Sequence, residues 1–513
     1  MKMLRLYIFI IMSIIGMPAE AQSALTDSLH YHVEVQTSLA NGDHTPFWLN
    51  ANKYGLSSLE KSNGYVRGTL TRPLSADDDK KWGVGYGLDL ALAYNYTSTL
   101  VVQQAYVEGR WLKGTLTLGS KEHPMGLKNQ ELSTGSQTLG INARPIPQAR
   151  IALPDYWTIP GTKDWLALKG HIAYGLTTDD AWQKDFTQKQ NRYTEHALHH
   201  SKAGYLRVGP KNITLELGLE MACQFGGKNY LFYEGEPSDV FDNDVNLKSF
   251  WHAFVPGGSD ASDGDYQNAS GNHLGSWVAC LNFDYPTWAL GLYADQFFED
   301  HSGMLHLSSG GYGTGDERWV KKESRFFLHD FKDWLLGAEL KLKQLTWLNA
   351  IVAEYMYTKY QGGPVYHDHT SVISENICGR DDFYNHNLYT GWQHWGMVMG
   401  NPLYRSPIYN ADGNIEVYNN RFVACHLGFA GDPAPGLHYR VLATWQRGYG
   451  TYDRLFREPE ENVSLLGEAC YSLPSGWSVK AAVGLDSGEI YGDNKGVQLT
   501  IAKTGLLNFK KGK

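Results

Sequence analysis

The sequence has no long hydrophobic run outside its first residues. Beyond Leu6–Ile15 there is no apolar stretch of about 18 residues or more, which excludes an ordinary membrane-spanning helix. Positive charge is not in excess either, because 45 Lys and Arg stand against 54 Asp and Glu. The chain therefore has no basic surface of the kind that binds nucleic acid, and nucleic acid is not expected as a partner.

Cysteine is also scarce. The five cysteines are Cys223, Cys280, Cys378, Cys425 and Cys470. They are widely scattered and form no Cys-x-x-Cys pair, so the sequence predicts neither a disulfide framework nor a zinc site.

The first 21 residues have the parts of a secretory signal peptide. A charged start, an apolar stretch at Leu6–Ile15 and a small-x-small cleavage site at Ala19–Ala21 are all present. We therefore expect residues 1–21 to be removed as the mature chain leaves the cytoplasm. No cysteine follows the cleavage site, so a lipoprotein anchor is not expected at that point.

Alternation of bulky and small side chains is the strongest pattern in the chain. From Trp82 to Tyr94 every second residue is aromatic or aliphatic, and the residues between are Gly, Ala or Asp. This period of two predicts a β-strand with one apolar face. Aromatic residues near both ends suit a lipid-facing strand, because Trp and Tyr favour the two membrane interfaces. Soluble sandwiches and propellers also alternate, but their strands usually have about 5 to 6 residues, whereas a tilted barrel strand needs about 9 to 11.

The same period recurs in segments that are mostly paired by tight turns, as in β-hairpins. Seventeen such segments are found, at 30–40, 64–74, 82–95, 99–111, 113–119, 165–176, 201–209, 212–225, 274–285, 287–298, 333–342, 345–358, 421–431, 436–447, 462–473, 477–486 and 496–506. Both termini of an outer-membrane barrel should lie in the periplasm, so the number of strands must be even and we expect eighteen. The missing strand is expected within 41–63 or around 148–153. The predicted fold is all-β, a single transmembrane antiparallel β-barrel over residues 22–513.

Long connections alternate with the tight turns. The three longest are residues 226–273, 299–332 and 361–420. Short turns at one end and long loops at the other are typical of the periplasmic and extracellular ends of outer-membrane barrels. One further connection, Asp179–His200, breaks the period of two. Its apolar residues Trp182, Phe186, Tyr193 and Ala197 follow a period near 3.6, which predicts a helix with Thr178 or Asp179 as its cap.

Three stretches carry a more specific signal. They are TPFWLNANKYGLSSLEKSNGY (45–65), LGSKEHPMGLKNQELSTGSQTLGINARPIPQARIALPDYW (118–157) and YTGWQHWGMVMGNPLYRSPIYN (389–410). With them the chain resembles the Wzi-like capsule assembly family of Gram-negative outer membranes. The resemblance implies an eighteen-stranded outer-membrane barrel whose lumen is obstructed by short helices or loops. It also implies a lectin that holds exported capsular polysaccharide at the cell surface, without fixing the ligand or any binding residue.

The long segment 361–420 has the richest set of groups suited to sugars. Aromatic planes can pack on the C–H faces of sugar rings, while amide and imidazole groups can bond their hydroxyls. The residues predicted to bind polysaccharide are Tyr384, Tyr389, Trp392, Gln393, His394, Trp395, Tyr404 and Tyr409. Packing is the alternative, because a loop that closes a barrel mouth also needs an aromatic core, and for any single ring packing is the commoner role.

No metal site, cofactor or catalytic residue is predicted. Residues 226–273 contain eight carboxylates against two lysines, but no stretch fits the twelve-residue calcium loop with its terminal Glu. A solvated acidic loop is the default interpretation, with calcium as the alternative. His196, His199 and His200 are close in sequence, yet their spacing alone implies no metal geometry. No G-x-S-x-G nucleophile motif is present.

Three functions remain open from the sequence. The first is a non-enzymatic protein that binds exported capsular polysaccharide and attaches or organises it at the cell surface. Its expected partners are capsular polysaccharide and outer-membrane lipid, with the capsule export machinery as a further candidate. The alternative is a diffusion porin or solute channel, which the barrel by itself would also permit. A barrel enzyme acting on lipid or glycan is the third, and no catalytic constellation supports it.

Overall fold

The computed structural model describes residues 28–257, 269–299, 332–362 and 381–507. It also describes the backbone of four three-residue strands, β15 (Leu305–Leu307), β16 (Phe326–Leu328), β19 (Val365–His367) and β20 (Asn376–Cys378). The predicted signal peptide lies outside the described residues. So do most of the predicted loop 299–332 and much of 363–380.

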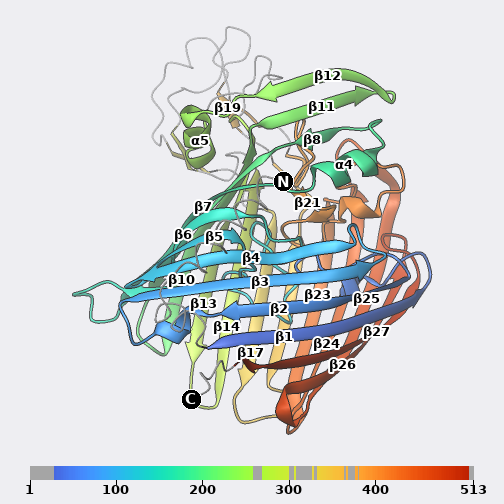
Figure 1. Cartoon of the computed structure of the whole chain (residues 1–513). Coiled ribbons are helices and arrows are strands. Elements are labelled where there is room, and N and C mark those ends of the chain that lie inside the picture. The colour runs from blue at the N-terminus through green and yellow to red at the C-terminus, as the bar shows by residue number, and fades with distance from the viewer. Residues whose placement is uncertain are drawn as a thin grey trace, which may run out of the picture.

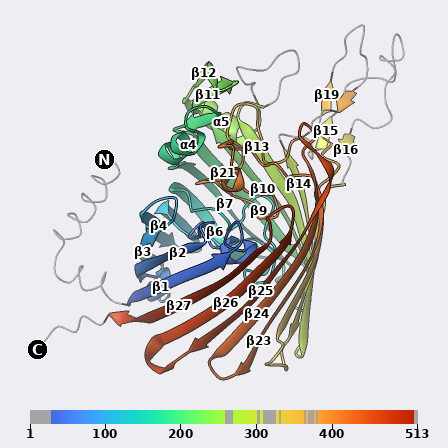
Figure 2. The same cartoon turned by 90° about the vertical axis from the view of Figure 1, so that its right-hand side faces the viewer.

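Eighteen antiparallel strands form one sheet that closes on itself, because β1 (Leu29–Asn41) pairs with β27 (Asn494–Leu507) along its whole length (Figure 1 and Figure 2). The strands between them are β2 (Ser62–Arg72), β3 (Trp82–Tyr94), β4 (Leu100–Trp111), β5 (Gly114–Ser120), β6 (Gln148–Thr158), β7 (Leu166–Leu176), β9 (Leu198–Val208), β10 (Ile213–Phe225), β13 (Asn272–Asp284), β14 (Trp288–Glu299), β17 (Trp334–Leu342), β18 (Ala350–Tyr357), β23 (Phe422–Ala434), β24 (Leu437–Gly450), β25 (Leu455–Ser472) and β26 (Trp477–Gly488). The predicted barrel and its strand number are confirmed.

The eighteenth strand is β6, near the second of the two positions expected from the sequence. Its alternation is interrupted at Pro154 and Asp155, and its pairing with β7 shifts register between Leu153 and Trp157. A proline donates no hydrogen bond to the ladder, which accounts for the break in pairing at this point. The other expected position, 41–63, holds the short helix α3 (Phe47–Asn50) instead.

The helix predicted over Asp179–His200 is correct only in its first part. Helix α4 (Asp180–Thr187) ends where Gln188 and Lys189 both adopt positive φ angles, of 50° and 53°. The residues after it form β8 (Tyr193–Glu195) and the start of β9. Trp182 and Phe186 stack on each other within the helix, but Tyr193 stacks on Tyr230 of a neighbouring strand. Tyr193 and Ala197 therefore fit the 3.6-residue period by coincidence, because the chain around them forms strands.

The remaining elements lie at one end of the barrel or in its turns. The sheet β8, β11 (Gly227–Tyr233) and β12 (Glu236–Asn243) stands above the rim with helix α5 (Leu247–Phe254), as Figure 1 shows. Shorter elements are β21 (Gln393–His394), β22 (Met397–Val398) and the 3-10 turns η1 (Leu74–Asp77), η3 (Pro407–Tyr409) and η4 (Pro474–Gly476). Among the described residues, no helix combines the length and apolar character needed to cross a bilayer.

The two ends of the barrel differ in their connections. The chain enters β1 and leaves β27 at the same end, where Leu29 pairs with Leu507. Connections at this end are short, such as Leu112–Lys113 between β4 and β5, and the long inserts lie at the opposite end (Figure 2). Outer-membrane barrels have short periplasmic turns and longer extracellular loops. The end at which the described chain enters β1 and leaves β27 is therefore periplasmic.

The outer and inner faces of the wall have opposite chemistry. Along β10, Ile213, Leu215 and Leu217 point outward and are exposed. Glu220 of the same strand points inward and is fully buried. Aliphatic side chains outside and polar ones inside are the arrangement that a barrel needs in a membrane.

Three segments of chain fill the lumen, and we call them together the plug: residues 43–61, 121–147 and 381–420. They bind one another through backbone groups, with Tyr54 N donating to Ile141 O (2.7 Å) and Gly140 N donating to Met399 O (3.0 Å). A Cβ atom at Gly140 would lie 2.4 Å from Gly400 O, so this close approach requires glycine. The main hydrophobic cluster of the molecule is formed mostly by plug residues and the inner wall.

The assignment of the outer face to lipid can be tested with two charge substitutions on β10. Leu217→Arg places a cation well inside the strand, and Ile213→Arg places one at its periplasmic end on the same face. An Arg on this face of a barrel costs about 2–4 kcal/mol at the bilayer midplane and about 0–1 kcal/mol near the interfaces. We expect this difference in urea unfolding of protein folded into lipid vesicles. Equal costs at both positions would contradict the assignment.

Candidate functional site

The residues predicted to bind polysaccharide lie in the third plug segment. Seven of the eight are buried, namely Tyr384, Tyr389, Trp392, Gln393, His394, Tyr404 and Tyr409. Trp395 is partly exposed. The structure thus brings all eight into one segment but gives only Trp395 an accessible ring.

The buried residues bind the second plug segment. Trp392 Nε1 donates to Thr138 O (3.0 Å), and its ring stacks on His199 of β9. Tyr404 Oη donates to Gln137 Oε1 (3.0 Å), and Tyr384 Oη donates to Gln137 O. These contacts give the rings a packing role, which was the alternative derived from the sequence. Because these seven side chains are buried, the structure gives no support for their contact with polysaccharide, and that role stays a prediction.

A buried carboxylate fixes the turn that carries Trp395. Asp179 Oδ2 accepts hydrogen bonds from Trp395 N (3.0 Å) and Gln393 Nε2 (3.2 Å). His394 Nε2 accepts from Thr178 N (3.1 Å), so its Nδ1 carries the proton and donates to Arg144 O (2.9 Å). Burial lowers the pKa of His394, which agrees with this neutral form.

Trp395 itself has an unusual backbone conformation. Its φ angle is 56°, in the left-handed region that bulky residues rarely adopt. The Arg144 guanidinium lies 4.3 Å from the centre of its ring, and Trp395 Nε1 donates to Thr178 Oγ1 (3.2 Å). Strained conformations of this kind persist only where the surroundings hold them, and they cluster at functional sites.

Arg144 connects Trp395 to the extracellular rim. Its guanidinium donates to Thr97 Oγ1 (2.6 Å) and Ser98 Oγ (3.2 Å), in the turn between β3 and β4. This turn and Thr178 both lie at the extracellular end of their strands. We call Trp395, Arg144, Thr97, Ser98 and Thr178 the Trp395 platform. Arg144 itself is buried, so the accessible part of the platform is the aromatic ring with its neighbouring hydroxyl groups, and this part is suited to a sugar.

The sequence pointed to Trp395 but not to the other members of the platform. Arg144 and Thr178 belong to segments 121–147 and 177–179, which are remote from 361–420 along the chain. The available signals were that 121–147 lacks the period of two although it lies between two strands, and that it belongs to a stretch carrying the family resemblance. The first signal indicates an insert, but neither indicates which residues meet Trp395.

Buried charges tie the plug to the wall. Lys128 Nζ lies 2.6 Å from Asp295 Oδ2 of β14, and both side chains are almost fully buried. Burial alone would lower the pKa of Lys128, but Asp295 and neighbouring carboxylates raise it overall, so the lysine is charged. Glu354 of β18 accepts from Ser133 Oγ (2.5 Å), Thr134 N (2.7 Å) and Tyr293 Oη (2.6 Å). The second plug segment is therefore held at several points.

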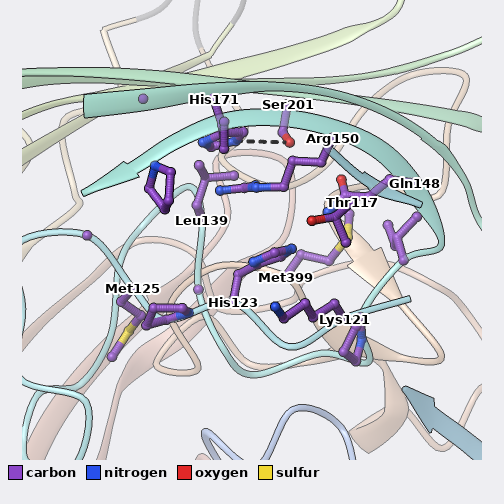
Figure 3. Close-up of a pocket in the computed structure, with 18 of the residues that line it drawn as sticks. Thr117, Lys121, His123, Met125, Leu139, Gln148, Arg150, His171, Ser201 and Met399 are labelled. Carbon is purple, nitrogen blue, oxygen red and sulfur yellow. Dashed lines mark hydrogen bonds between the residues drawn. The ribbon is translucent and has the colours of Figure 1, made fainter. Parts of the chain in front are cut away.

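A cavity of about 350 Å³ lies between the plug and the inner wall of β5, β6, β7 and β9 (Figure 3). Its lining includes Leu74 in a periplasmic turn and Thr115 at the periplasmic end of β5. The cavity therefore extends toward the periplasm, while Arg144 of the Trp395 platform also borders it. In Figure 3 the Arg150 side chain extends across the cavity between His171 and His123.

Metal ligands do not cluster in the described part of the chain. No group of three or more His, Cys, Asp or Glu side chains is placed there to hold a metal ion. His199 and His200, adjacent in sequence, point to opposite faces of β9, because His199 lines the lumenal cavity and His200 packs against Phe254 of α5. Alternation along the strand therefore separates these two side chains.

A closed eighteen-stranded barrel with an aliphatic outer face, a polar inner face and a filled lumen defines an outer-membrane protein of Gram-negative bacteria. The family described as capsule assembly protein Wzi matches residues 26–315, more than half of the chain. The protein therefore belongs to the Wzi capsule assembly family, and the resemblance seen in the sequence is confirmed.

Solved structures similar to this chain include one of the same family and two other barrels, and the first of these supports the fold. Wzi of Escherichia coli, described as a carbohydrate-binding β-barrel involved in group 1 capsule assembly, is 14% identical, with a TM-score of 0.57 over 96% of this chain and 87% of that chain. OprD of Pseudomonas aeruginosa is 11% identical over 94% of this chain and 96% of its own, with a TM-score of 0.42. OccK5 of the same organism is 9% identical over 94% and 98%, with a TM-score of 0.45. No curated protein matches the sequence.

The contribution of the Lys128–Asp295 pair to plug anchoring can be measured by removing one partner. Lys128→Met leaves the buried Asp295 carboxylate without its counter-charge, which typically costs about 3–5 kcal/mol. We expect this loss in denaturant unfolding, together with easier proteolysis within 121–147. Adding Asp295→Asn should restore part of the stability, because the unpaired charge is then removed. A double variant no more stable than Lys128→Met would contradict the electrostatic explanation.

Proposed function

We propose that this protein binds exported capsular polysaccharide at the cell surface and attaches or organises it there, without enzymatic activity. Membership of the capsule assembly family supports this role, and the E. coli structure of the same fold is described as carbohydrate binding. The observation that carries the proposal is the filled lumen. The three plug segments contact one another and fill the lumen. This arrangement favours binding of the polysaccharide at the rim over its passage through the barrel.

The Trp395 platform is the proposed contact for the polysaccharide. It combines the one accessible ring of the predicted set with a guanidinium and three hydroxyl groups at the extracellular end. The ring can pack on a sugar face, and the hydroxyl groups can exchange hydrogen bonds with sugar hydroxyls. Arg144 is only 6% exposed, so its role is to hold the ring and the hydroxyl groups in position.

The diffusion porin is the alternative function. A porin needs a continuous water-filled lumen, whereas here the plug residues form the main hydrophobic cluster together with the inner wall. Planar-bilayer conductance separates the two functions, since a plugged lectin should conduct little and a porin should show steady, large currents. The outer-membrane lipid around the barrel is the second partner of the proposed function, and a capsule exporter is a third candidate.

Loss of the protein should separate capsule synthesis from capsule retention. In a strain that lacks the gene we expect normal total polysaccharide but release of much of it into the medium, because the surface attachment is missing. The measurement is the ratio of cell-bound to released polysaccharide, with the wild-type gene restored as the control. Unchanged retention would argue against an attachment role.

Two tryptophans of the same segment provide a matched pair for the binding site. Trp395→Ala should weaken binding of the purified capsular polysaccharide roughly 10-fold while the barrel stays stable, because a partly exposed stacking ring is lost. Trp392→Ala should instead destabilise the protein by about 3–5 kcal/mol, because Trp392 is buried and hydrogen-bonded. Polysaccharide affinity and thermal unfolding of both variants are the measurements. Normal binding by Trp395→Ala would move the site elsewhere.

A further inference from the structure

The cavity beneath the plug has a charge that the structure leaves largely uncompensated. The Arg150 side chain lines it and forms no ion pair or hydrogen bond with any described residue. Lys169 lies over the rings of Tyr156 and Tyr205, at 4.7 and 5.0 Å, and likewise has no ion-pair partner in the described residues. The cavity therefore presents Arg150 without a counter-charge of its own, and Lys169 without a direct ion pair, although Glu220 and Glu216, which lines the adjacent cavity, act on Lys169.

Carboxylates are nearly absent from this lining. Glu108 is the one carboxylate among the described residues that line the cavity, and Lys121 Nζ lies 2.5 Å from its Oε2. The other carboxylates on this side of the lumen, including Glu216 and Glu339, line an adjacent cavity of about 760 Å³. An anion that entered the first cavity would thus meet a net positive charge.

Neutral hydrogen-bonding groups surround these cations. His199 is 6% exposed, and its Nδ1 has no hydrogen-bond partner among the described residues. His171 Nε2 lies 3.4 Å from Ser201 Oγ, and Thr117 and Gln148 add a hydroxyl and an amide. Burial lowers the pKa of His123 well below its ordinary value, so it is a neutral donor and acceptor. Groups that both donate and accept suit the hydroxyls of a sugar.

The opposite wall of the cavity is apolar. Met125, Leu139 and Met399 of the plug line it (Figure 3). Such side chains can cover the C–H face of a sugar ring while the polar wall binds its hydroxyls. The volume of about 350 Å³ is at the lower end of the range for small-molecule sites, about 300–1000 Å³.

We propose that this cavity is a second saccharide site, which binds an acidic sugar unit with its anionic group against Arg150 and its ring between the plug and Ser201. A guanidinium presents a planar fork that fits a carboxylate or a phosphate through two hydrogen bonds. A uronate and a sugar phosphate share this chemistry. The site takes its ligand from the periplasmic side, because its lining reaches Leu74 and Thr115. Arg144 of the Trp395 platform also borders the cavity, but the Trp395 ring, which carries the surface attachment proposed above, does not line it.

The test uses the full chain in detergent and four probes: methyl glucuronide, glucose 1-phosphate, methyl glucoside and inorganic phosphate. By calorimetry we expect one or both acidic sugars to bind at least about 10-fold more tightly than methyl glucoside and than phosphate. A preference between the two acidic sugars identifies the anionic group. Equal binding of phosphate and the acidic sugars would overturn the saccharide assignment, and no binding of either acidic sugar would overturn the site.

Variants connect the binding to the cavity. Arg150→Gln should weaken the acidic sugar about 10- to 100-fold, the loss expected for a charged hydrogen-bonded pair. Arg207→Gln is the matched control, because Arg207 also faces the lumen but lines only the adjacent cavity, and it should bind normally. Trp395→Ala should also bind these small probes normally, which separates this site from the surface platform. Unchanged affinity in Arg150→Gln would overturn the proposal.

Two milder variants keep the test valid if Arg150→Gln fails to fold. Arg150→Lys keeps the charge but loses the planar fork, and Thr117→Val removes a hydroxyl from the same cavity without changing its charge. Both should bind the acidic sugar several-fold more weakly while keeping the heat-dependent gel shift of a folded barrel. Wild-type affinity in both variants would count against the proposal as strongly as in Arg150→Gln.

Discussion

The need to pair every backbone N–H and C=O group inside a membrane controls this structure. Lipid offers no hydrogen bonds, so strands can cross it only if the sheet has no free edge. The pairing of β1 with β27 meets that requirement and brings the two ends of the described chain to the same side. Once the sheet is closed, the period of two places aliphatic residues against lipid and polar residues in the lumen. The polar side chains of the inner wall then need hydrogen-bond partners of their own.

The plug satisfies much of that second requirement, because each of its segments donates a backbone N–H to a carboxylate on the wall. Phe47 N donates to Asp486 of β26, Thr134 N to Glu354 of β18, and Tyr384 N to Glu299 of β14. Buried carboxylates are costly unless they are hydrogen-bonded. These contacts therefore favour the filled barrel over an empty one, and they make the plug part of the folded wall.

The strands could be predicted from the sequence because a regular period of two is a local property. Most predicted strands lie within a few residues of the observed ones, and the larger differences have local causes. Strand β18 begins at Ala350 and not at Leu345, because residues 343–349 form the turn. Strand β6 could be placed only as one of two alternatives, since Pro154 and Asp155 interrupt its period.

The site could be predicted only in outline, because its geometry depends on contacts between distant segments. The mixture of aromatic and amide groups in 381–420 is compatible both with sugar binding and with packing. The choice between them depends on partners such as Thr138 for Trp392 and Gln137 for Tyr404, which lie more than 250 residues away along the chain. No local pattern contains that information.

The same distant contacts explain why Trp395 differs from its neighbours. Its left-handed backbone conformation is unfavourable by itself and needs the hydrogen bond to Asp179, the bond from its indole to Thr178 and the adjacent Arg144. Relaxing this turn would return the backbone to an ordinary conformation but would break those contacts and leave the fully buried Asp179 carboxylate with fewer donors. The contacts with Asp179, Thr178 and Arg144 thus hold the Trp395 ring at the extracellular surface. A rigid plug is therefore what allows one aromatic side chain to stay in a fixed position at the extracellular rim.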